Sequence, residues 1–75
     1  MEKVADIEVR ACIDSVDGSV LWVEEKDADY FSVYGGEASA FEWVADFNDK
    51  NDAINFAKAR AMRLGAMFHN RIGVN

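Results

Sequence analysis

Residues 41–65 read FEWVADFNDKNDAINFAKARAMRLG, and within them the spacing of hydrophobic residues changes from every second position to a helical period. Up to residue 47 the alternation is typical of a half-buried strand. One set of alternate residues is Phe41, Trp43, Ala45 and Phe47, and the other is Glu42, Val44 and Asp46. Asn48 and Asp49 then offer side-chain oxygens that can cap the first amides of a helix. The stretch therefore predicts a strand that leads directly into a helix.

The predicted helix has a thin apolar stripe, rich in alanine. Its members are Ala53, Ile54, Ala57, Ala61 and Leu64. Because small residues on a helix and bulky residues on a strand fill space well together, we expect this stripe to pack on the strand's aromatic face. Gly65 follows the stripe and can adopt the left-handed conformation that closes a helix.

Three strands are predicted before this stretch, at residues 4–13, 20–25 and 30–34. Turn residues such as Asp17-Gly18 separate them, and Gly35-Gly36 is predicted to end the third strand before a loop at residues 37–40. The continuous apolar run of the second strand leaves open which of its side chains face the core. Either Trp22 or the pair Leu21 and Val23 would do so.

The order of these elements, ββββα, predicts an α+β fold with an antiparallel sheet of about four strands and one helix packed on one face. Residues 66–69 fit either a short fifth strand or an irregular end, and residues 71–75 are predicted to be a loose tail. A length of 75 residues favours a single domain. The lone Cys12, the absence of a signal-like N-terminus and the lack of a membrane-length apolar run favour a cytoplasmic protein.

The residue types that carry catalysis or bind metals are sparse. His69 is the only histidine, and a lone histidine near a chain end is usually a surface residue. The acidic residues of the segment 24–29 lie at a turn without the glycine that an EF-hand calcium loop needs, and they are interpreted as solvated charges. We therefore expect no catalytic site, no metal site and no cofactor.

Charge is distributed unevenly along the chain. Residues 1–48 carry twelve acidic and three basic residues, a balance of −9, whereas residues 49–75 carry two acidic and five basic residues, a balance of +3. The acidic half contains the predicted sheet. Such a surface repels phosphate backbones and attracts basic proteins, so direct nucleic-acid binding through the sheet is not expected.

A single helix covers only one face of a sheet, and strand alternation predicts which side chains lie on each face. The helix-facing set is Ile7, Val9, Phe31, Val33, Trp43 and Phe47. On the other face, the candidate partner-binding residues are Asp6, Glu8, Tyr30, Tyr34, Glu42, Val44 and Asp46. Tyrosines among carboxylates suit a basic protein partner, although tyrosines are also ordinary surface residues of strands.

The short length, the ββββα order, the acidic sheet and the lack of a catalytic constellation resemble small inhibitor proteins of bacteriophages and mobile elements, including anti-CRISPR and anti-restriction proteins. The segment FEWVADFNDKNDAINFAKARA also resembles the strand-to-helix unit of many small bacterial and phage proteins. The inhibitor resemblance implies an acidic sheet face that occupies a basic nucleic-acid-binding surface of a host complex. Two alternatives stay open. One is a homodimer formed through the uncovered faces, and the other is nucleic-acid binding by Lys58, Arg60, Arg63 and Arg71.

Overall fold

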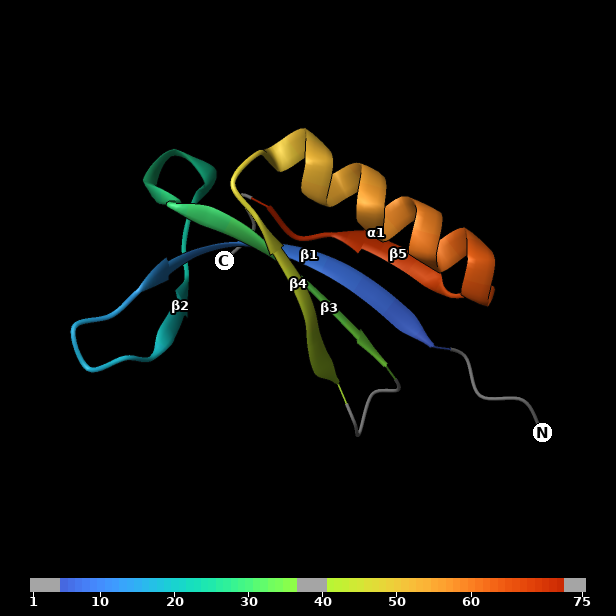
Figure 1. The fold of residues 1–75 in the computed structure, drawn as a ribbon, viewed down its shortest axis with the longest axis horizontal. Helices are drawn as coiled ribbons and strands as arrows, with labels where there is room; N and C mark the ends of the chain where they lie inside the picture. The colour runs from blue at the N-terminus through green and yellow to red at the C-terminus, as the bar shows by residue number, and fades with distance from the viewer. Residues whose placement is uncertain (1–4, 37–40, 73–75) are drawn as a thin grey trace.

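The structure is a computed structural model that describes residues 5–36 and 41–72 of the chain. In chain order its elements are β1 (Asp6–Asp14), β2 (Val20–Trp22), the 3-10 turn η1 (Glu25–Asp27), β3 (Tyr30–Gly36), β4 (Glu42–Phe47), α1 (Lys50–Leu64) and β5 (Met67–Asn70). The helix lies along one face of the sheet, as Figure 1 shows. The predicted α+β class, with one helix on a largely antiparallel sheet, is confirmed.

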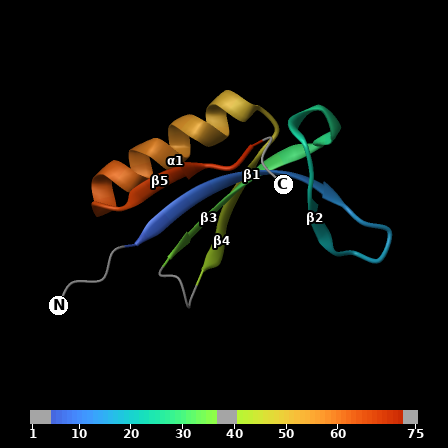
Figure 2. The ribbon, with the colours of Figure 1, turned by 180° about the vertical axis from the view of Figure 1, so that it is seen from behind.

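β1 is the central strand of the sheet. One of its edges pairs antiparallel with β3, which in turn pairs with β4. Its other edge is shared, because β2 pairs antiparallel with residues 12–14 and β5 pairs parallel with residues 6–9. The parallel pairing follows from the crossover of α1, which returns the chain to the sheet in the direction of β1. Figures 1 and 2 both show β5 beside β1, with β2 extending beyond the helix.

Local capping fixes both ends of α1. The Asp49 side chain accepts a hydrogen bond from Asn51 N at 2.7 Å, as its position before the helix predicted. Gly65 ends the helix with a φ of 67°, and the following Ala66 N donates to Ala61 O at 2.8 Å. This geometry confirms the prediction that Gly65 closes the helix in the left-handed conformation.

The core lies between the alanine stripe of α1 and the inner faces of β1 and β3. Its buried members are Ile7, Val9, Ala11, Phe31, Val33, Ala53, Ala57 and Ala61. The small helix residues bring the backbone of α1 close to the branched side chains of the strands, which allows dense packing in a chain of this size. Leu64 does not belong to the core, contrary to the prediction, because its side chain is 54% exposed at the last turn of the helix.

The C-terminal ends of β2 and β3 differ from the sequence-based prediction. β2 ends at Trp22 because the chain turns into η1 soon after it. The last backbone hydrogen bond before this turn is from Val23 N to Ala11 O, at 2.9 Å. β3 continues through Gly35-Gly36, since both glycines pair in register with β1. Of the alternatives for the segment after the helix, the strand is correct, and it forms β5.

The predicted loose tail is wrong for its first two residues. Arg71 N donates to Val9 O at 3.0 Å, and Ile72 packs against the core. Residues 73–75 lie outside the described residues, as do residue 4 of the predicted first strand and the predicted loop at residues 37–40.

Candidate binding face

The sheet face opposite α1, here called the open face, takes side chains from all five strands. The strand registers place on it Asp6, Glu8, Arg10, Cys12 and Asp14 of β1, Trp22 of β2, Tyr30, Ser32 and Tyr34 of β3, Trp43 and Asp46 of β4, and His69 of β5. Five of the predicted partner-binding residues therefore lie together, namely Asp6, Glu8, Tyr30, Tyr34 and Asp46.

The predicted positions of Glu42 and Val44 are wrong because β4 contains a β-bulge. Ala45 pairs with Val33, but the next pair is Trp43 with Tyr34, so Val44 is an extra residue in the strand. An extra residue reverses the alternation on its N-terminal side. Val44 consequently packs against the core, and Glu42 shares the helix-side face with its partner Gly35.

The same bulge moves Trp43 to the open face, where the prediction had placed it toward the helix. Its side chain is 59% exposed, and its Nε1 donates to Asp46 Oδ1 at 2.8 Å. Ser32 Oγ donates to the same carboxylate oxygen. Asp46 therefore holds the indole in a fixed orientation beside Tyr34.

Trp22 covers the centre of the open face from the other side. The guanidinium carbon of Arg10 lies 3.8 Å from the centre of the Trp22 ring, a cation–π contact. The Trp22 and Tyr34 rings meet edge to face with centres 5.9 Å apart. Trp22, Tyr34 and Trp43 thus form a row of aromatic side chains across the sheet, here called the aromatic row.

Glu8 holds Arg10 under this row. Arg10 Nε donates to Glu8 Oε2 at 2.7 Å, and Arg71 Nε lies 3.9 Å from the other carboxylate oxygen. Glu8 is only 8% exposed. Its charge is therefore neutralised inside the protein, and Glu8 positions Arg10 rather than offering a free carboxylate to a partner.

Two further carboxylates anchor the rim of the open face. Asp14 Oδ1 accepts a hydrogen bond from the Tyr30 hydroxyl at 2.8 Å. Partial burial, together with this carboxylate, raises the pKa of Tyr30. At the other end, Asp6 Oδ1 lies 3.0 Å from His69 Nε2, which joins β1 to β5. His69 therefore links β5 to β1 at the rim of the open face.

The centre of the open face is buried although no helix covers it. Cys12 is fully buried and Ser32 is 1% exposed, because the larger open-face side chains close over them. This burial raises the pKa of the Cys12 thiol. The open face is accordingly a packed, preorganised surface with exposed aromatic groups.

Sequence reasoning missed Trp22 and Trp43 as residues of this site. Trp22 lies in a continuous apolar run without alternation, so the sequence carries no signal for its face. Near the bulge, the sequence departs from strict alternation only in the adjacent apolar residues Val44 and Ala45. A strand can contain such a pair without forming a bulge.

Among the described residues, no group of three or more histidine, cysteine, aspartate or glutamate side chains is placed to hold a metal ion. α1 is too short and too polar to span a membrane. Searches of family models, curated proteins and solved structures found nothing that matches this chain.

Proposed function

We propose that the protein is a non-catalytic binding module whose open face recognises a basic surface of a partner protein or nucleoprotein complex. The observation that carries the proposal is the aromatic row, whose two tryptophans are exposed among carboxylates on a sheet face that α1 leaves uncovered. Tryptophan and tyrosine supply much of the binding energy at protein interfaces. Exposed aromatic groups held rigidly by hydrogen bonds lose little conformational entropy when a partner binds.

The chemistry of the open face favours lysine or arginine as the contacting groups. The protein already binds one guanidinium on this face in the same way, because the Trp22 ring and the Glu8 carboxylate together hold Arg10. A partner's cation placed on Trp43 beside Asp46 would meet the same two kinds of group. The exposed acids of the open face would also steer a basic partner toward it and repel phosphate groups.

A role as an inhibitor is the biological setting that we propose for this surface. The resemblance to phage and mobile-element inhibitors, including anti-CRISPR proteins, implies occupation of a basic groove that normally holds nucleic acid. The mechanism would be steric and electrostatic, with no covalent step. Trp43 and Tyr34 would act as anchors, while Asp6, Asp14 and Asp46 would govern the rate of association.

The test uses a fluorescent reporter that the chain already contains. Both tryptophans lie on the open face, so intrinsic tryptophan fluorescence reports on this surface alone. An oligo-arginine peptide is titrated at low and at high salt, and association and dissociation are followed by stopped flow. The expected result is a fluorescence change with an association rate that falls as salt rises.

Two variants with the same change in net charge distinguish binding through the open face from a general effect of net charge. Asp6→Asn, Asp14→Asn and Asp46→Asn together should slow association and weaken its salt dependence. The control carries the same charge change outside the open face, as Glu24→Gln, Asp27→Asn and Asp52→Asn, and should bind nearly as the parent does. Equal effects of the two triple variants would refute the proposed face. Trp43→Ala should instead accelerate dissociation, corresponding to a loss of about 1–3 kcal/mol.

Two further experiments on this protein test the homodimer and the nucleic-acid-binding alternatives. A homodimer through the open faces would appear in sedimentation experiments, with stronger association at high salt where the opposed carboxylates are screened. Nucleic-acid binding by the helix would appear as a DNA gel shift at low salt, which Arg60→Gln and Arg63→Gln would weaken. The proposal expects no such shift, and expects release of DNA from a complex with the oligo-arginine peptide.

A further inference from the structure

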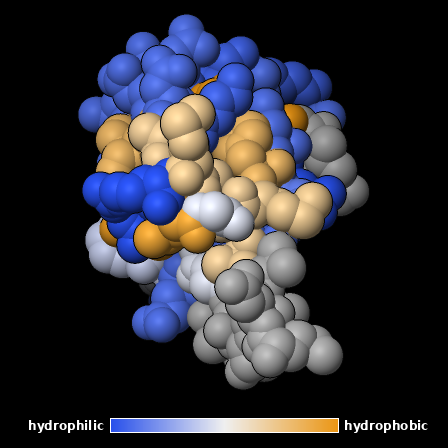
Figure 3. Space-filling model, turned by 90° about the vertical axis from the view of Figure 1, so that its right-hand side faces the viewer, coloured by the Kyte–Doolittle hydropathy of each residue, from blue (hydrophilic) through white to orange (hydrophobic). Residues whose placement is uncertain are grey.

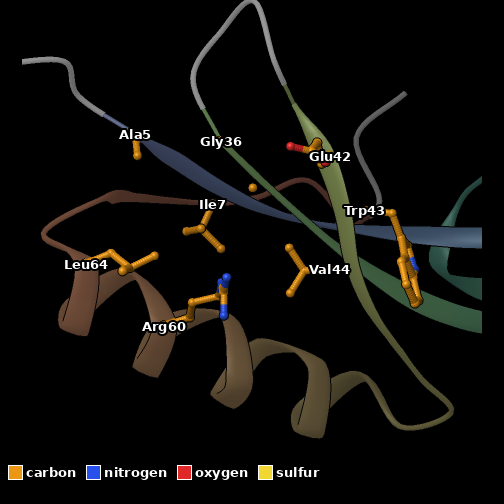
Figure 4. A pocket seen from close by; sticks show the side chains of 9 residues that line it. Ala5, Ile7, Gly36, Glu42, Trp43, Val44, Arg60 and Leu64 are labelled. Atoms are coloured by element: carbon orange, nitrogen blue, oxygen red, sulfur yellow. The ribbon is translucent and has the colours of Figure 1, made fainter.

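A groove lies on the helix side of the sheet, between the C-terminal half of α1 and the adjoining ends of β1, β3 and β4. Its volume is about 510 Å³, within the range of small-molecule sites. Figure 4 shows the helix and β4 as its two walls, with Ile7 between them. Trp43 of β4 also lines the groove, but its side chain points away from it toward the open face (Figure 4).

Apolar side chains form part of the groove's lining, beside polar groups. Ile7, Val44 and Leu64 approach it from β1, β4 and α1, respectively. Leu64 is 54% exposed, which is high for a leucine that ends a core-facing helix. Figure 3 shows hydrophobic residues gathered at this end of the molecule, below the hydrophilic outer surface of the helix.

The floor of the groove is kept open by Gly35. A Cβ atom at this position would lie 2.7 Å from Ile7 Cδ1 and 3.6 Å from Val44 Cγ2. Ile7 therefore occupies the space that a side chain at residue 35 would need. A side chain at residue 35 would displace the end of the Ile7 side chain, although the backbone conformation there does not require glycine.

Arg60 is the basic residue of the groove. Its side chain points from α1 into the space between Ile7, Val44 and Leu64 (Figure 4). Its Nε atom is buried and has no hydrogen-bond partner among residues 5–36 and 41–72. A buried donor without a partner is destabilising, and the planar guanidinium is suited to bind a carboxylate. Glu42 also lines the groove, but its side chain is exposed and lies at the far end from Arg60.

We propose that this groove binds a small aliphatic carboxylic acid. Its carboxylate would pair with the guanidinium of Arg60, and its hydrocarbon chain would lie along Ile7, Val44 and Leu64. The hydrocarbon chain of the bound acid would cover apolar surface of the groove, and its carboxylate would accept hydrogen bonds from the Arg60 guanidinium. This site is independent of the function proposed for the open face.

The probe is decanoate, compared with decanol and with the cationic decyltrimethylammonium, all below their aggregation concentrations. Binding is followed by amide and methyl NMR shifts. Decanoate should shift the signals of Ile7, Val44 and Leu64, leave the indole signal of Trp22 unchanged, and bind about tenfold or more tightly than decanol. Equal affinities for the three compounds, or shifts centred on Trp22, would overturn the proposal.

The test variant is Arg60→Gln, and the matched control is Arg63→Gln, which removes the same charge from the same helix outside this groove. Arg60→Gln should lose the preference for decanoate over decanol, whereas Arg63→Gln should change it less than about twofold. An equal loss in both variants would mean that general charge, and not Arg60, selects the ligand. Leu64→Ser alters an exposed wall residue, so it leaves the fold intact even if Arg60→Gln does not. It should weaken decanoate binding, and unchanged binding would also contradict the proposal.

Discussion

Replacing Ala57 by leucine tests the packing on which the fold depends. Ala57 is fully buried at the middle of the alanine stripe, where α1 lies on the inner faces of β1 and β3. Leucine adds three carbon atoms at a position without free space, so either the helix must lift or neighbouring side chains must leave their preferred rotamers. Overpacking of this kind costs about 1–3 kcal/mol. For a domain of this length, that corresponds to a decrease in the melting temperature of roughly 5–20 °C.

The matched control is Ala59→Leu, two residues further along the same helix, where the side chain is exposed. Alanine and leucine have similar helix propensities, so the control should change the free energy of unfolding by less than about 0.5 kcal/mol. Both variants are compared with the parent by urea and thermal unfolding, followed by circular dichroism. If Ala57→Leu unfolds at the same midpoint as Ala59→Leu, then Ala57 does not lie between helix and sheet, and the packing described above is wrong.

Two other predictions concern single residues. Gly65→Ala should destabilise the protein by about 1 kcal/mol, because Gly65 has a positive φ while no atom lies within 4 Å of the added Cβ; an unchanged urea midpoint would show that this left-handed cap is not maintained in solution. The raised pKa of Tyr30 means that the folded protein holds the phenol proton more tightly than the unfolded chain. Stability should therefore be full below the ordinary tyrosine pKa of about 10 and should fall as the pH rises above it, as measured by urea unfolding. Tyr30→Phe should reduce this alkaline decline, and an equally steep decline in the variant would contradict the role of Tyr30.

The features that could be predicted from the sequence depend on interactions between near neighbours in the chain. Asp49 caps α1 by bonding an amide two residues away, and Gly65 ends the helix through its own backbone conformation. The alternation of β1 likewise follows from the geometry of a single strand. The helix phase was correct for Ala53, Ala57 and Ala61 because one period relates them. Residue type and spacing were therefore enough to predict the fold class, the element order and most of the acidic residues of the open face.

The tertiary structure decided where those elements meet. The bulge at Val44 depends on how β4 matches β3, and this match alone exchanges Trp43 with Glu42 and Val44 between the two faces. The face of Trp22 likewise depends on its pairing with Cys12 and its contact with Arg10. The sequence by itself determined the local elements and the sign of the sheet's charge, since both follow from residue type and spacing. Pairing between distant strands determined which aromatic groups are exposed, and the packing of α1 on the sheet placed Arg60 in a groove beside apolar side chains, because register and contact are properties of the folded chain as a whole.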